Sequence, residues 1–112
     1  MELDPDNVSN YDSRGFSYLS KDELDRAVAD FDQAIELDPN NAVSYLGRGY
    51  TYMGKGDLDR AIADFERAIE LDPADALAYI NRGFAYAENG DLDRAIADYT
   101  EVLRISNDLN VR

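Results

Sequence analysis

The chain has 112 residues, and its 11 Lys and Arg against 24 Asp and Glu leave a formal net charge of −13. This charge repels phosphate backbones and anionic lipids, so nucleic acid and membranes are poor candidate partners. The absence of Cys and His excludes disulfides, thiol nucleophiles, imidazole bases and the usual zinc ligands, so we expect neither a metal nor a cofactor.

The sequence repeats itself with a fixed step. Tyr11, Tyr45 and Tyr79 are each 34 residues apart. A repeat of this length is one supersecondary unit that cannot bury its apolar face alone, so stacked neighbours must supply the core. We predict a lead-in over residues 1–7 that resembles the tail of a preceding repeat, then three repeats and a short tail, with the repeats at 8–41, 42–75 and 76–109 and the tail at 110–112.

In the first repeat, the periodicity predicts helices near residues 8–20 and 23–37. The second helix carries one apolar face that we expect to be buried, formed by Leu24, Ala27, Val28, Phe31, Ala34 and Ile35. Asp22 stands where the other repeats have Gly56 and Gly90. We therefore expect a differently shaped turn there, with Asp22 in a left-handed conformation.

In the second repeat, residues 42–54 form the predicted first helix, and Gly54-Lys55-Gly56 breaks it. Asp57 is a suitable N-cap for the next helix, which ends at Asp72-Pro73 because proline lacks an N–H. The apolar residues of this second helix recur at three- and four-residue spacing and predict a buried face of Leu58, Ala61, Ile62, Phe65, Ala68 and Ile69.

In the third repeat, helices are predicted near residues 76–89 and 91–106. Ser106-Asn107 replaces Asp-Pro, so we expect the last helix to run long, with Ile105 and Leu109 continuing its apolar stripe. By analogy with the other repeats, the buried face of this helix is predicted to comprise Leu92, Ala95, Ile96, Tyr99, Val102 and Leu103.

These residues resemble the tetratricopeptide repeat signature. Tyr45, Gly49, Tyr52, Ala61, Phe65 and Pro73 have its spacing, with Tyr where the pattern has Trp, and the other two copies are in register. Arg14-Gly15, Arg48-Gly49 and Arg82-Gly83 replace the Leu-Gly of the pattern, which resembles a bacterial-type variant. The resemblance implies an all-α, right-handed superhelical solenoid of three antiparallel helix-turn-helix repeats, about six helices in all. It also implies a concave surface lined by the first helix of each repeat.

The first helices carry a second apolar stripe beside the one needed for packing. If the family geometry holds, this stripe and one amide line the groove: Phe16, Leu19, Val43, Leu46, Tyr50, Met53, Leu77, Ile80, Asn81 and Phe84. The alternative is that the stripe packs between repeats. The first stripe and the second helices already provide a full packing set, so we favour a groove that binds an apolar or aromatic peptide with basic flanks.

Chaperone-binding members of this family clamp a terminal carboxylate with Lys, Asn and Arg on the groove face. In this chain the matching places hold Ser9, Ser13, Val43, Gly47 and Leu77, which leaves only Asn81. The resemblance therefore disfavours an acidic C-terminal tail as the ligand, in agreement with the net charge.

Each repeat also holds an Arg in its first helix and an Asp sixteen residues later. The pairs are Arg14 and Asp30, Arg48 and Asp64, and Arg82 and Asp98. Three arginines in register would suit an anion site, but a repeated ion pair that links the two helices is the simpler interpretation, because an unpaired semi-buried guanidinium is costly.

Carboxylates near the helix starts, as in Asp-Leu-Asp-Arg at 57–60 and 91–94, already have a structural reason in capping and the helix dipole. They show no calcium-loop spacing and no facing pair across a pocket, so we expect neither a metal site nor an enzyme. No apolar run approaches the ~18 residues of a membrane span and no signal peptide is evident, so we expect a cytoplasmic location.

The predicted function is a protein–protein interaction module that binds a peptide or protein segment in its groove. The alternative is a self-associating structural unit, either part of a longer array or an engineered repeat scaffold, which contacts other copies through its uncapped ends or its last helix.

Overall fold

The computed structural model describes the backbone of residues 7–111 and the side chains of residues 7–108, and over this part of the chain it contains helices and no strands. The helices are α1 (Val8–Ser20), α2 (Leu24–Leu37), α3 (Ala42–Gly54), α4 (Leu58–Leu71), α5 (Ala76–Glu88) and α6 (Leu92–Val111). The positions agree with those expected from the sequence, and α6 runs long as predicted. Residues 1–6 of the predicted lead-in at 1–7 and the Leu109 side chain lie outside the described residues.

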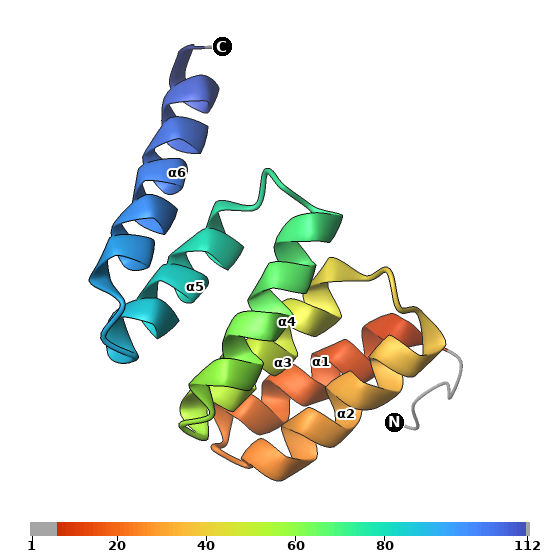
Figure 1. Ribbon diagram of the computed structural model, residues 1–112. Coiled ribbons are helices and arrows are strands. Elements are labelled where there is room, and N and C mark those ends of the chain that lie inside the picture. The colour runs from red at the N-terminus through yellow and green to blue at the C-terminus, as the bar shows by residue number, and fades with distance from the viewer. Residues whose placement is uncertain (1–6, 112) are drawn as a thin grey trace.

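The helices form three antiparallel pairs that stack in chain order (Figure 1). Each pair consists of a first helix (α1, α3 or α5) and a second helix (α2, α4 or α6), and each second helix of the first two pairs also packs against the next first helix. This arrangement is an all-α solenoid. No helix of the described part of the chain is both long and apolar enough to cross a membrane.

Short polar residues set the helix ends. Asn41, Asp57 and Asp75 cap the starts of α3, α4 and α5, and the Asp57 carboxylate accepts from the Arg60 backbone N–H at 3.2 Å, as predicted for this N-cap. The turns inside the pairs need a left-handed residue. Asp22 supplies it in the first pair with φ 60°, which confirms the predicted left-handed Asp22, whereas Gly56 and Gly90 supply it in the others. The expected difference in turn shape was wrong, because the three turns have the same backbone hydrogen bonds.

The core lies between the pairs and uses small residues to bring the helices close. Phe31 and Phe65 are the largest fully buried side chains, and each belongs to a second helix. The core also contains fully buried alanines, which are Ala27, Ala34, Ala61, Ala78 and Ala85, and Phe65 packs with Ala61 and Ala85. The predicted buried faces of α2 and α4 are therefore buried or half-buried in the structure.

The prediction for the third repeat was wrong on one point. Ala95 is buried and Val102 is half-buried, but Leu92, Ile96 and Leu103 are 61–64% exposed, and Tyr99 is exposed as well. The corresponding faces of α2 and α4 are covered by α3 and α5, whereas α6 packs only against α5 among the described helices. The outer face of α6, which we define as Leu92, Ile96, Tyr99 and Leu103, is therefore uncovered in this structure.

Candidate functional site

The predicted groove residues lie on the first helices, and most of them line three neighbouring pockets. The central one, the apolar pocket, has a volume of about 290 Å³ and takes two residues from each of α1, α3 and α5. Its lining consists of Phe16, Leu19, Leu46, Tyr50, Leu77 and Asn81. Asn81 is its only amide and is itself buried.

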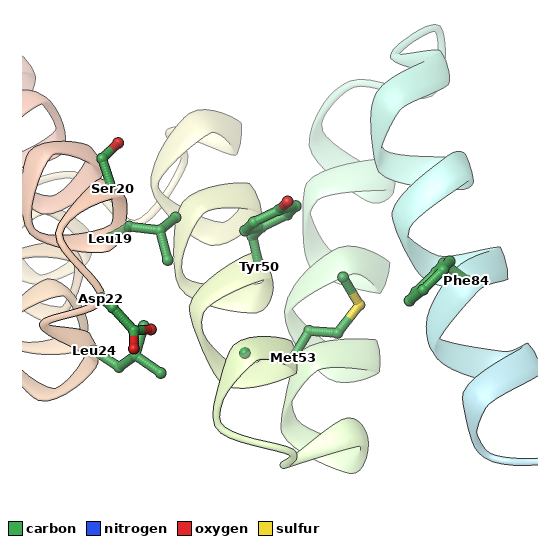
Figure 2. A pocket seen from close by; sticks show the side chains of 8 residues that line it. Leu19, Ser20, Asp22, Leu24, Tyr50, Met53 and Phe84 are labelled. Atoms are coloured by element: carbon green, nitrogen blue, oxygen red, sulfur yellow. The ribbon is translucent and has the colours of Figure 1, made fainter.

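A second pocket, the Met53 pocket, continues from it toward the turns and has a volume of about 560 Å³. Figure 2 shows Leu19 on α1, Tyr50 and Met53 on α3, and Phe84 on α5 arranged across the three first helices. Leu24, Asp22, Ser20 and Gly54 complete its lining. Tyr50 and Leu19 belong to both pockets, so the apolar surface is continuous between them.

The third pocket, the Asp12 pocket, lies at the other end of the row and has a volume of about 420 Å³. It is lined by Ser9, Asp12, Ser13, Phe16, Asn41 and Val43. Phe16 also lines the apolar pocket, so the three pockets form one groove. Ile80 is exposed but lines none of these three pockets.

The groove residues fall into two groups by burial. Tyr50 and Phe84 are 47% and 49% exposed, and Phe16, Val43, Leu77 and Ile80 are also exposed. In contrast, Leu46 and Met53 pack against core residues such as Phe65 and Ala61. Leu46 thus has two roles, and a change there would disturb the core together with the groove.

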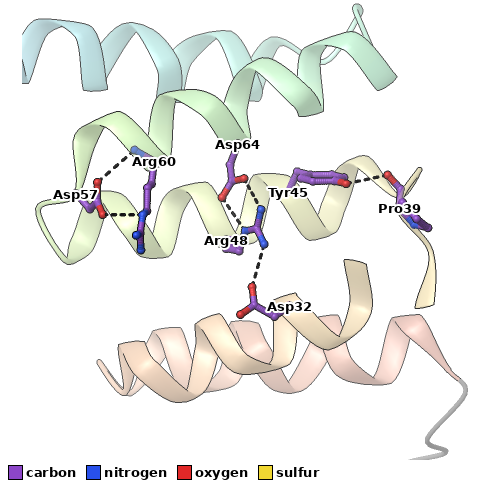
Figure 3. A network of polar contacts seen from close by, with 7 residues as sticks. All are labelled: Asp32, Pro39, Tyr45, Arg48, Asp57, Arg60 and Asp64. Atoms are coloured by element: carbon purple, nitrogen blue, oxygen red, sulfur yellow. Dashed lines mark hydrogen bonds and ion pairs between the residues drawn. The ribbon is translucent and has the colours of Figure 1, made fainter. Parts of the chain in front are cut away.

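In each repeat, the Arg on the first helix faces the Asp on the second helix of the same repeat. Arg48 donates from Nε and Nη2 to the two carboxylate oxygens of Asp64 at 2.9 and 2.7 Å (Figure 3). Arg14 pairs in the same way with Asp30, and Arg82 with Asp98. Hydrogen bonding to Asp64 raises the pKa of Arg48, which stays charged. Each of these arginines thus forms an ion pair with a buried carboxylate.

Tyrosines of the repeated motif lie against these arginines, two each at Arg48 and Arg82 and Tyr18 at Arg14. The Arg48 guanidinium lies 5.7 Å from the ring centroid of Tyr45 and 5.9 Å from that of Tyr52, and the Tyr45 hydroxyl donates to the Pro39 carbonyl at 2.9 Å (Figure 3). This cation–π arrangement was not among the features predicted from the sequence. The signal was present, because residues three before and four after an arginine share its helix face.

Asp12 was also missed. It is 6% exposed, and its carboxylate oxygens accept from the Ser44 hydroxyl at 2.8 Å and from the Asn41 amide at 3.3 Å. Burial raises the pKa of Asp12, and the hydrogen bond from Ser44 opposes this shift. The signal in the sequence was a disagreement between repeats, because Leu46 and Ile80 occupy the matching positions.

The described residues contain no group of three or more carboxylates placed to hold a metal ion.

Family models then identify the repeats. A TPR repeat model matches residues 15–56 and 49–90, and a tetratricopeptide repeat model matches residues 76–108. The chain belongs to the tetratricopeptide repeat (TPR) family. A search of curated proteins finds no match.

Solved TPR structures resemble the chain closely. A crystal structure of MamA has a TM-score of 0.93 at 27% identity, over 98% of this chain and 64% of the MamA chain. The second TPR of Spaghetti (RPAP3), bound to the HSP90 peptide SRMEEVD, has a TM-score of 0.84 at 26% identity, over 88% of this chain and 91% of that one. The first TPR of the same protein, with the same peptide, has a TM-score of 0.86 at 25% identity, over 94% and 83%.

Proposed function

We propose that this TPR chain is a protein-interaction module that binds an apolar or aromatic segment of a partner in the groove defined above. The observation that carries the proposal is the row of exposed apolar side chains across α1, α3 and α5, in which Phe16, Tyr50 and Phe84 take part. Tyr50 and Phe84 belong to neither core cluster, whereas the Phe16 ring also packs edge-to-face on the core residue Phe31, with 5.0 Å between the ring centroids. Contiguous exposed apolar surface of more than a few hundred Å² generally marks an interaction site.

The solved neighbours support a peptide as the ligand class, because two of them are TPR domains bound to the peptide SRMEEVD. That peptide is acidic toward its end. In this chain, Asp12 is the only ionisable residue lining the pocket at one end of the groove, and Asp22 lies at the other end. With a net charge of −13, the groove suits a segment with basic flanks better than an acidic one.

The test uses a phage-displayed library of random peptides and a double variant of the exposed groove residues, Tyr50→Ser with Phe84→Ser. We choose Phe84 over Leu46 because Leu46 also packs against the core. The wild type should enrich peptides rich in apolar and aromatic residues. The double variant should lose this binding while its circular dichroism stays helical.

The matched control removes two apolar side chains of similar or greater exposure from a different surface, the outer face of α6. Leu92→Ser with Ile96→Ser should leave peptide binding intact. If the wild type selects no peptides, or if the α6 control loses binding as completely as the groove variant, the groove is not the binding site.

A second candidate function is self-association, in which the chain is a structural unit that contacts other copies through its repeat ends or last helix. The exposed Leu92, Ile96 and Leu103 on α6 favour it. Sedimentation velocity on the wild type and on Leu92→Ser with Ile96→Ser tests it. Oligomers that the α6 variant dissolves would support this function, and a wild type that stays monomeric at high concentration would exclude it.

A further inference from the structure

Asp12 differs from the other buried carboxylates. Asp30, Asp64 and Asp98 are each 4–5% exposed, about as little as Asp12, and each accepts two hydrogen bonds from an arginine. No Lys or Arg of the described residues forms an ion pair with Asp12. A carboxylate that is buried without a cationic partner is costly to fold.

The donors that Asp12 does have are neutral. Ser44 and Asn41 each donate one hydrogen bond, and a carboxylate has about four acceptor sites, so further sites are free. Asp12 is also the only ionisable residue among the six that line its pocket. The pocket is large enough for a side chain, and Phe16 and Val43 give it apolar walls.

We propose that the Asp12 pocket binds a lysine or arginine side chain of the bound segment, a proposal that rests on the proposed function. The charged head of that side chain would pair with the carboxylate, and its aliphatic stem would lie along Phe16 and Val43. Phe16 lines the apolar pocket too, so the basic residue stands close in sequence to the apolar residue that fills the apolar pocket. The recognised segment therefore contains a basic and a large apolar residue at a fixed, short spacing.

A purely structural role for Asp12 makes a different prediction. Its two hydrogen bonds tie α1 to the start of α3, and they could be its whole purpose. In that case any change that disturbs these bonds would affect peptide binding alike, and the carboxylate charge would not matter. Variants that separate the charge from the hydrogen bonds distinguish the two roles.

The experiment selects peptides from the same random library on four proteins: the wild type, Asp12→Asn, Ser44→Ala and Asp22→Asn. The Asn variant removes the charge of Asp12, whereas Ser44→Ala removes one of its hydrogen bonds and keeps the charge. Asp22→Asn removes a charge at the opposite end of the groove, and Asn tolerates the left-handed φ of 60° found there.

We expect the wild type, Ser44→Ala and Asp22→Asn to enrich a basic residue at one fixed distance from an apolar residue. Asp12→Asn should lose only that basic preference. A synthetic peptide of the selected sequence should bind Asp12→Asn roughly tenfold to a hundredfold more weakly than the wild type, and changing its basic residue to a neutral one should remove the difference.

The inference is overturned if the wild type selects apolar peptides with no basic preference, or if Asp12→Asn keeps the preference. It is also overturned if Ser44→Ala loses the preference while remaining folded. If the wild type selects no peptides at all, the proposed function itself fails, and the inference fails with it. Thermal melts by circular dichroism on all four proteins show whether each variant is folded.

Discussion

Arg48 holds Asp64 through two hydrogen bonds of 2.9 and 2.7 Å, and its Nη1 donates a third, at 2.9 Å, to Asp32 on the preceding second helix. One side chain thus links the helices of its own repeat and connects that repeat to the one before it. The side chain of Arg14, which among the described residues forms an ion pair with Asp30 alone, is 46% exposed, against 22% for Arg48. The arginine of the motif therefore contributes more to stability in the second repeat than in the first.

The first prediction concerns this pair. Arg48→Leu leaves the buried carboxylate of Asp64 without a partner, and we expect it to lower the free energy of unfolding by about 2–4 kcal/mol. Arg14→Leu should cost less because more of its side chain reaches solvent. Arg104, whose ion pairs with Glu101 and Asp108 are exposed, is the control, and its change to Leu should leave the free energy of unfolding nearly unchanged. Urea unfolding measures all three. An unchanged stability for Arg48→Leu would contradict the structural role.

The second prediction concerns the close approach of α2 and α3. A Cβ atom at Gly47 would lie 2.5 Å from two ring carbons of Phe31, and that ring is fully buried. Gly47→Ala should therefore destabilise the protein by about 1–3 kcal/mol. At Gly54, the nearest side-chain atom to an added Cβ is on Leu24 at 3.6 Å, an ordinary contact, so Gly54→Ala should be neutral or slightly stabilising. Equal thermal melting temperatures for the two variants would show that the helices can separate without cost.

The third prediction concerns the turns inside the pairs. Gly56 has φ 79° and no neighbour near an added Cβ, so Gly56→Ala tests backbone strain alone and should cost about 1 kcal/mol. Asp22→Gly should change the free energy of unfolding in the opposite direction and stabilise the protein by up to about 1 kcal/mol. The reason is that φ 60° is unfavourable for a residue with a Cβ. If Asp22→Gly is destabilising, the Asp22 side chain contributes more to the turn than its backbone conformation costs.

The fourth prediction concerns pH. Burial raises the pKa of Asp12 above its ordinary value of 3.8, so folding favours the protonated form of this carboxyl. Its contribution to stability is therefore fully present below the unfolded pKa and is lost as the pH rises through the folded pKa.

Asp12→Asn removes this dependence. The free energy of unfolding of the variant, relative to that of the wild type, should be highest near neutral pH. This difference between the two proteins should shrink as the pH falls toward about 4. No other ionisable residue lines the pocket, so the difference between the two proteins reports Asp12. Urea unfolding at a series of pH values measures it. A difference that stays constant with pH would show that the Asp12 pKa is the same in the folded and unfolded states.

The fold could be predicted from the sequence because each element is specified locally. The three- and four-residue spacing of apolar positions places the helices, Asp57 and Pro73 mark ends, and the step between Tyr11 and Tyr45 shows that the units stack. The left-handed Asp22 was predictable too, because it replaces a glycine. The bacterial-type character of the Arg-Gly variant stays a prediction.

The burial of individual side chains and the shape of the groove depend on how neighbouring helices pack, which the sequence pattern alone does not show. Leu92 and Leu58 are equivalent in sequence, but Leu58 is covered by the next repeat and Leu92 is not, so the pattern alone predicted the wrong burial for α6. Leu46 likewise belongs to core and groove at once, which no helical wheel can show. The pocket around Asp12 combines α1 with the start of α3, and only the packed helices bring those residues together.

The central claim is that the face formed by the first helices binds the partner. The direct measurement is the nuclear magnetic resonance spectrum of the isotope-labelled protein, titrated with a peptide selected from the random library. We expect the largest backbone amide shifts on α1, α3 and α5, around Phe16, Tyr50 and Phe84, with the outer face of α6 unchanged. Shifts concentrated at Leu92, Ile96 and Leu103 would contradict the claim and move the interaction surface to the end of the solenoid.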